Sequence, residues 1–205
     1  MKNIDILYVL DHYHLGPKCG GPFVSVNNII DCVKKKYKKI GVLSNKISSQ
    51  NSNINYFFEF SFTDLNKLFR KFNIKIVHFN TFFSLKLLIF TFFAFFYNYR
   101  IIISPRGEIM DGALKRGFFK KKIFILIFKS FSIFFQKRIK FHYTHIDEQK
   151  QSSMRFKNHD YSICQNIPRK IIPKARNINS FDTLKFCFFS RVEPKKNLMF
   201  TLKVL

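Results

Sequence analysis

Two apolar runs in the sequence end in polar side chains that could bind a ligand. The run IKIVHFN at 74–80 carries His78 and Asn80 on one side of an extended chain, because side chains alternate along a strand. The run at 100–105 leads into SPRGE, where Arg106 projects a fixed positive fork suited to anionic groups. The competing interpretations are a hydrogen-bonded buried histidine at 78 and a surface loop arginine at 106. If both runs are strands of an open parallel sheet, their carboxyl ends lie at its ligand-binding edge.

Two further stretches could bind phosphate. Gly20 and Gly21, in GGP, stand between an apolar run and a helical pattern, where glycines let the backbone approach an anion at a helix N-terminus. Arg191 and Lys196, in RVEPKKN, follow a later apolar run and could flank one phosphate group. A tight β–α turn and an exposed basic turn are the ordinary interpretations of the two stretches.

The stretch FHYTHIDEQ at 141–149 also ends an apolar run. We expect Thr144 to cap the helix that follows it, with Glu148 in the first turn of that helix. Taken alone, a plain capping arrangement explains Glu148 better than a role in a site.

Apolar runs alternate with helical spacing, which predicts an α/β fold. We expect strands at 4–10, 40–44, 55–60, 74–80, 100–105, 140–145 and 161–167, and helices at 23–36, 62–72, 83–97, 115–138 and 146–156. The strand runs are almost continuously apolar, which is typical of parallel strands covered on both faces. The sequence therefore predicts a Rossmann-like, doubly wound parallel sheet.

A change of composition after residue 167 predicts a domain boundary. We expect 1–167 to form an N-terminal domain and 168–183, with two prolines and no periodicity, to form a linker. Residues 184–205 read as the first strand, loop and helix of a second α/β domain that stops there. A length of 205 residues fits one domain and the beginning of another.

The net charge of +24 predicts an affinity for polyanions, which include nucleic acid, anionic lipid and phosphorylated small molecules. Nucleic acid is the least supported, because no helix-turn-helix, RNP or zinc spacing is present. The four cysteines form no CxxC pair, which indicates a reducing compartment and no metal site. No uncharged apolar run reaches about 18 residues and no signal peptide is recognisable, so we expect a cytoplasmic location.

The predicted helix at 115–138 mixes lysines with phenylalanine and isoleucine. One interpretation is a buried core helix with solvated ends. The other is a helix in a membrane interface, held by apolar burial and by anionic lipid. The sequence does not decide between them.

In their order along the chain, these stretches resemble the retaining glycosyltransferases of family 4, which have the GT-B fold. The resemblance is carried by GGP, IKIVHFNTFFS, IISPRGE, FHYTHIDEQ, CQNIP and FFSRVEPKKNL. The last is similar to that family's GRL-PxKG stretch, with Ser190 and Asn197 in place of its glycines. The SPRGE form is similar to a subset that acts in polysaccharide and O-antigen assembly.

The resemblance implies two Rossmann-like domains with the active site between them. Under it, the catalytic residues are His78 and Arg106, the donor-binding residues are Gly20, Gly21, Arg191 and Lys196, and the acceptor-binding residues are Asn80, Glu108 and Glu148. The co-substrate is a nucleotide-sugar, with no other cofactor and no metal ion. The family's C-terminal pair of glutamates has no counterpart before Leu205, and many relatives carry a histidine where this chain has Pro105 and Arg106.

We therefore expect a glycosyltransferase, truncated in its C-terminal domain, that moves a sugar from a nucleotide-sugar to a lipid-linked or surface polysaccharide acceptor. We expect it in the cytoplasm, peripherally at the inner membrane face, where an anionic membrane surface is a possible partner. The alternative is a catalytically inactive, membrane-associated or interaction fragment that retains the acceptor domain.

Overall fold

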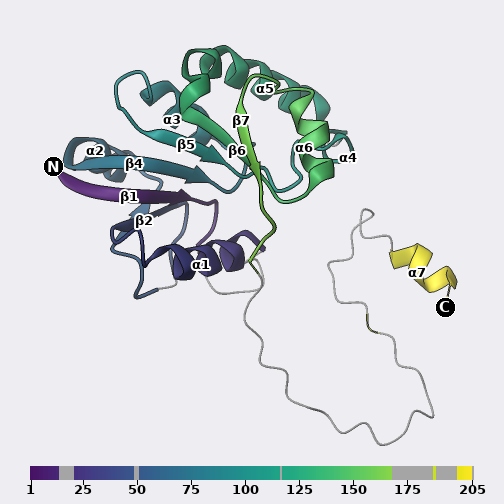
Figure 1. The fold of residues 1–205 in the computed structure, drawn as a ribbon, viewed down its shortest axis with the longest axis horizontal. Coiled ribbons are helices and arrows are strands. Elements are labelled where there is room, and N and C mark those ends of the chain that lie inside the picture. Colours follow the sequence, from purple (N-terminus) through teal and green to yellow (C-terminus); the bar gives the residue numbers. More distant parts are fainter. Residues whose placement is uncertain (14–20, 49–50, 116, 168–186, 188–197, 205) are drawn as a thin grey trace, which may run out of the picture. The chain divides into compact units, whose positions relative to one another are not determined.

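A seven-stranded sheet with the order β3-β2-β1-β4-β5-β6-β7 organises the N-terminal part of the chain (Figure 1). The computed structural model describes residues 1–13, 21–48, 51–115, 117–167, 187 and 198–204. The strands are β1 (Lys2–Val9), β2 (Ile40–Ser44), β3 (Tyr56–Glu59), β4 (Phe72–Phe79), β5 (Arg100–Ile103), β6 (Ile139–Tyr143) and β7 (Asp160–Ile163). Every neighbouring pair is parallel. The α/β, doubly wound parallel sheet predicted from the sequence is confirmed.

The helices are α1 (Gly21–Val33), α2 (Phe62–Lys71), α3 (Leu85–Phe93), α4 (Asp111–Leu114), α5 (Phe118–Ser132), the 3-10 helix η1 (Ile133–Arg138), α6 (Ile146–Ser153) and α7 (Leu198–Val204). The single helix predicted at 115–138 is wrong in its extent, because α5 begins only at Phe118 and ends at Ser132. Gly117 precedes α5 with a φ of 72°, a left-handed conformation that separates α5 from α4.

Helices cover both faces of the sheet, and each face has its own apolar core. Phe90 of α3 and Phe128 of α5 are completely buried on one face. Val26 and Ile30 of α1 are completely buried on the other. Figure 1 shows α1 on one side of the sheet and α3 and α5 on the other. The strands are buried between the two cores, as their continuous apolar runs predict.

The order in which strands join the sheet reverses between β1 and β4. The chain adds β2 and β3 on one side of β1 and then returns to pair β4 with its other side. Such a switch point opens a crevice at the carboxyl ends of the two strands, where ligands bind in open α/β sheets. The topology therefore predicts that ligand-binding residues lie just after β1, β4 and β5.

The chain divides into two compact units, Met1–Arg169 and Lys170–Leu205. The predicted linker at 168–183 lies outside the described residues, as does residue range 184–197, apart from Cys187, where the second domain was predicted to begin with a strand and a loop. Of the second unit, the structure describes α7 as a helix. Within the described ranges of both units, no helix combines the length and apolar character needed to cross a bilayer.

Phe82 anchors the loop that follows β4. It is completely buried, and its ring lies against those of Phe124 at 5.6 Å, Phe128 at 5.1 Å and Phe156 at 5.4 Å between centroids. The loop that follows the polar end of β4 is therefore held in place by aromatic packing against α5.

Truncating this ring should destabilise the protein strongly. We expect Phe82→Ala to lower the free energy of unfolding by about 3–5 kcal/mol, through lost burial and the cavity left behind. Phe62→Ala is the matched control, because Phe62 is 86% exposed, and we expect a change below about 0.5 kcal/mol. Urea denaturation measures both, and equal effects of the two substitutions would contradict the anchoring role.

Candidate functional site

The polar residues predicted at the sheet edge lie together in the structure. His78 is in β4 and Asn80 directly follows that strand, while Arg106 lies in the loop after the neighbouring strand β5. The Nη2 of Arg106 donates to the Oδ1 of Asn80 over 2.8 Å. Because parallel strands share their carboxyl edge, two stretches 26 residues apart in sequence form one cluster.

A chain of hydrogen bonds links His78 to His142 of β6 through the buried hydroxyl of Ser104. Ser104 Oγ lies 2.8 Å from His78 Nε2 and 2.8 Å from His142 Nδ1. His142 Nε2 lies 3.0 Å from the carbonyl oxygen of Cys164. That carbonyl can only accept, so His142 carries its proton on Nε2 and its Nδ1 accepts from Ser104. Ser104 in turn accepts from His78, whose proton is on Nε2 and whose Nδ1 keeps its lone pair.

Both imidazoles are held neutral. Burial, with smaller contributions from the nearby His142 and Arg106, lowers the pKa of His78 to about 3. Burial also lowers the pKa of His142, although the carbonyl of Cys164 opposes that shift. A group with so low a pKa is a weak base at neutral pH. His78 is therefore suited to accept a hydrogen bond from a ligand hydroxyl rather than to hold its proton.

Arg106 is held between two asparagines in an unusual backbone conformation. Its Nη1 donates to Asn166 Oδ1 over 2.6 Å, while its Nη2 holds Asn80. Its φ is 51°, in the left-handed region that residues other than glycine rarely adopt. Burial lowers the pKa of Arg106, but a guanidinium stays charged in proteins. Its Nε is buried and lacks a hydrogen-bond partner among the described residues.

Glu148 of α6 fixes the loops around Arg106. Its carboxylate is buried, with 2% of the residue exposed. One oxygen accepts from the backbone N–H of Gly107 over 2.6 Å. The other accepts from the N–H and the hydroxyl of Thr144, over 2.8 and 2.9 Å. The structure thus gives Glu148 a positioning function, and its proposed contact with an acceptor stays a prediction.

The expected cap of α6 is wrong. The N-cap is His145, whose side chain accepts from the backbone N–H of Asp147 over 3.2 Å. Thr144 is not the cap, because its hydroxyl is bound to the carboxylate of Glu148.

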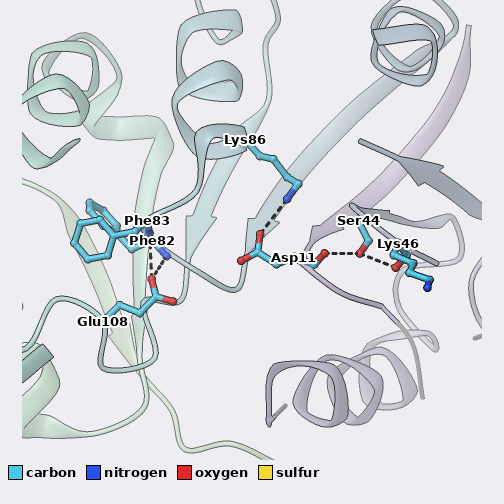
Figure 2. A network of polar contacts seen from close by, with 7 residues as sticks. All are labelled: Asp11, Ser44, Lys46, Phe82, Phe83, Lys86 and Glu108. Atoms are coloured by element: carbon cyan, nitrogen blue, oxygen red, sulfur yellow. Dashed lines mark hydrogen bonds and ion pairs between the residues drawn. The ribbon is translucent and has the colours of Figure 1, made fainter. Parts of the chain in front are cut away.

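Glu108 lies in the loop after β5 and holds the neighbouring loop after β4. Its Oε2 accepts from the backbone N–H groups of Phe82 over 2.7 Å and Phe83 over 3.1 Å (Figure 2). Burial raises the pKa of Glu108 and these two hydrogen bonds oppose the shift, while the nearby Asp11 adds to it. Its predicted contact with an acceptor is not tested by these bonds, since the carboxylate keeps further lone pairs.

An ion pair that was not expected from the sequence lies beside this loop. Asp11 follows β1 at the switch point, and its carboxylate accepts from Lys86 of α3 over 3.0 Å. Lys86 is 3% exposed and lies 5.0 Å from the ring centroid of Phe60, whereas Asp11 is about half exposed. Figure 2 shows the remaining carboxylate oxygens of Asp11 and Glu108 turned toward each other at the sheet edge. The carboxylate of Asp11, held by Lys86 and about half exposed, can accept hydrogen bonds from ligand hydroxyls.

The predicted phosphate-binding residues are for the most part outside the described residues. This applies to Gly20, Arg191 and Lys196. Gly21 is the first residue of α1, and a Cβ at this position would meet nothing within 4 Å. Steric contact with the described protein therefore does not explain a glycine at 21. Within the described ranges, no group of three or more His, Cys, Asp or Glu residues could hold a metal ion.

Ser104, His142 and Asn166 complete the cluster, and the sequence did not single them out. The alternation of side chains along β6 could have identified His142. It lies between Phe141 and Tyr143, which are buried on the other side of the strand, so its own side chain points to the opposite side. The register that places Phe141 opposite Ile103 also brings His142 level with Ser104. That register is not readable from a single chain.

Comparison of the chain with protein-family models, with curated proteins and with solved structures finds no match.

The neutral state of buried His78 has a consequence for stability. Between pH 6.5 and about 3 the unfolded chain binds a proton at this residue and the folded chain does not. Stability should therefore fall as the pH drops through this window, by up to about 1.4 kcal/mol per pH unit. We expect His78→Asn to show a shallower loss between pH 6.5 and 4.5.

Urea denaturation across this range measures the difference. The comparison at pH 7.5 isolates the effect of the substitution on packing, because His78 is neutral in both states well above 6.5. Parallel stability curves of the two proteins below pH 6.5 would show that His78 is not held neutral.

Proposed function

We propose that this chain is a glycosyltransferase resembling the retaining enzymes of family 4, and that its N-terminal unit is the acceptor-binding half. It transfers a sugar from a nucleotide-sugar to a lipid-linked or surface polysaccharide acceptor. The single observation that carries the proposal is the contact of Arg106 with Asn80, beside His78, at the carboxyl edge of β4 and β5. Two of the six stretches that carry the resemblance meet at this carboxyl edge of the sheet.

The chemistry of these groups suits a sugar with a phosphate leaving group. Arg106 supplies fixed positive charge where negative charge develops as the bond to the leaving group breaks. Asn80 fixes the orientation of the guanidinium, because it accepts from Nη2. His78, neutral and with its lone pair on Nδ1, orients a hydroxyl of the acceptor or of the transferred sugar. Ser104 positions His78, because their hydrogen bond selects this tautomer.

In this proposal the nucleotide-sugar donor is a co-substrate rather than a resident cofactor. Its diphosphate would bind Arg191, Lys196 and the glycines at 20 and 21, as the resemblance implies. A lipid-linked acceptor places the reaction at the cytoplasmic face of the membrane, with the protein bound peripherally. The net charge of +24 supports this location, because anionic lipid attracts a basic surface.

A second candidate is a catalytically inactive fragment that binds a membrane or a partner. The observation that favours it is the internal pairing of the site, since Arg106 donates to both Asn80 and Asn166. An arginine that only pins two loops would not respond to a ligand. Binding measurements therefore separate the two candidates.

The decisive test is calorimetric binding of UDP-glucose, UDP-N-acetylglucosamine and GDP-mannose to the full chain. We expect one of them to bind and Arg106→Gln to weaken it by about 10- to 100-fold, the loss of a hydrogen bond from a charged group. Arg100→Gln is the matched control, because Arg100 is exposed at the opposite end of the same strand β5.

The outcome of this test assigns the function. If no nucleotide-sugar binds, or if Arg100→Gln weakens binding as much as Arg106→Gln, the glycosyltransferase proposal is wrong. The melting temperature of each variant shows whether a loss of binding reflects a loss of folding.

A further inference from the structure

The outer side of α5 is apolar although it faces away from the core. Phe119 is 79% exposed, Ile123 58% and Leu126 66%. With about 3.6 residues per turn these positions fall on one side of the helix, and the completely buried Phe128 falls on the opposite side. The α5 stripe, as we call this surface, consists of Phe119, Ile123, Leu126 and Ile127 of α5 with Ile133 and Phe134 of the following η1. A helix that is apolar all round is normally covered on every side.

The end of α3 enlarges this apolar surface. Phe92, Phe95 and Phe96 are 46%, 48% and 70% exposed. Phe95 lies 5.6 Å from the ring of Phe134, and Phe92 lies 6.0 Å from the ring of Phe131. The exposed aromatic side chains of the two neighbouring helices thus form a continuous surface, which is larger than singly scattered apolar residues produce.

Lysines border the α5 stripe on both sides. Lys120 projects from one flank of α5, while Lys122 and Lys129 project from the other, given their helical spacing. Between 115 and 138 the chain has no Asp or Glu, and its basic residues are Lys115, Arg116, Lys120, Lys121, Lys122, Lys129, Lys137 and Arg138. An apolar strip with basic borders is the pattern of helices that lie in the plane of a membrane interface.

A cavity of about 200 Å³ opens beside the first turns of α5. Apolar walls are supplied by Leu114, Phe118 and Ile125, and the cationic groups by Lys121, Lys122 and Arg155. Arg155 is paired with Asp111 over 2.5 Å, and Lys122 lies 5.8 Å from the ring centroid of Phe118. Lys121 donates to the carbonyl oxygen of Ala113 over 2.6 Å and lies 5.1 Å from the ring centroid of Phe83. Lys122 therefore supplies the charge that borders both the cavity and the α5 stripe. This combination fits a phosphate that is attached to an apolar chain.

The charge pattern selects among possible occupants. A second copy of the chain would also carry a net charge of +24, and the repulsion between like charges opposes that association. Nucleic acid would meet the lysines but would leave the leucine and isoleucine side chains of the stripe uncovered. A bilayer rich in anionic phospholipid complements both features, because its phosphates meet the lysines and its acyl region meets the stripe.

We propose that the α5 stripe docks this protein on an anionic phospholipid bilayer, with one lipid phosphate bound beside Lys122, which lines the cavity and flanks the stripe. The inference rests on the proposed function for its reason, since a lipid-linked acceptor lies at a membrane. It goes further in naming the surface that lies on the lipid. It needs neither a sugar nor a nucleotide, so it can be tested separately.

The test is sedimentation of the full chain with vesicles of phosphatidylcholine alone or with about 40% phosphatidylglycerol, which gives the vesicle a negative surface potential. We expect binding to the anionic vesicles only. Replacing Ile123 and Leu126 by serine should weaken it by at least about tenfold, through lost apolar burial. Phe62→Ser is the matched control, because Phe62 is exposed on α2.

A second pair of variants tests the charges. Lys120→Gln with Lys122→Gln should weaken vesicle binding by about 10- to 30-fold, since each lysine near an anionic surface contributes about fivefold. Lys35→Gln with Lys38→Gln is the control, as these lysines are exposed after α1 on the other face of the sheet. Inorganic phosphate at millimolar concentration should not release the protein, because it offers no apolar chain.

The possible results are distinguishable. Equal binding to both kinds of vesicle, or no effect of the serine substitutions, overturns the inference. Release by inorganic phosphate shows a site for free phosphate instead of lipid, and a dimer in solution that the serine substitutions abolish shows a second copy as the occupant. Sedimentation without nucleotide-sugar binding supports this inference while refuting the proposed function, and the reverse result does the opposite.

Discussion

The candidate site depends on the buried carboxylate of Glu148. Three hydrogen bonds join it to Gly107 and Thr144, and so connect the loop after β5 to the loop after β6. A buried charge is costly unless it is paired or hydrogen-bonded, and here the bonds also hold the left-handed backbone at Arg106 next to Gly107. Without this carboxylate the backbone next to Arg106 would lose its hydrogen bond to α6, and only the contacts with Asn80 and Asn166 would hold the guanidinium.

The sheet and its ligand-binding edge could be predicted because their signals are local. Continuous apolar runs identify buried parallel strands, and the carboxyl ends of such strands meet whatever the sequence between them. His78, Asn80 and Arg106 could be placed together on that basis alone. The extent of α5 could not, because the left-handed glycine at 117 that separates it from α4 gives no periodic signal.

The partners of these residues could not be predicted, because they depend on register and on side-chain burial. Ser104 looks like the last residue of an apolar run, and only the pairing of β5 with β6 makes it the link between two histidines. Lys86 is one of many lysines in a basic chain, and nothing local shows that it is buried beside Asp11 at the switch point. The core interpretation of the helix at 115–138 holds for one side of α5, where Phe128 is completely buried. The other side is apolar and exposed, and its binding to a membrane stays a prediction.

The edge site and the apolar outer surface belong to one packed unit, and Phe82 joins them. Its backbone N–H is bound by Glu108 at the sheet edge, while its ring packs on Phe124 and Phe128 of α5. The α5 stripe lies on the other side of that same helix, about one helix diameter, or 10 Å, further out. If the α5 stripe docks on lipid and the edge site receives a lipid-linked acceptor, as proposed, the two must keep a constant separation so that the acceptor reaches the site. Aromatic packing across a single helix satisfies that requirement, because a close-packed interior has low compressibility and keeps the distance between its two sides constant.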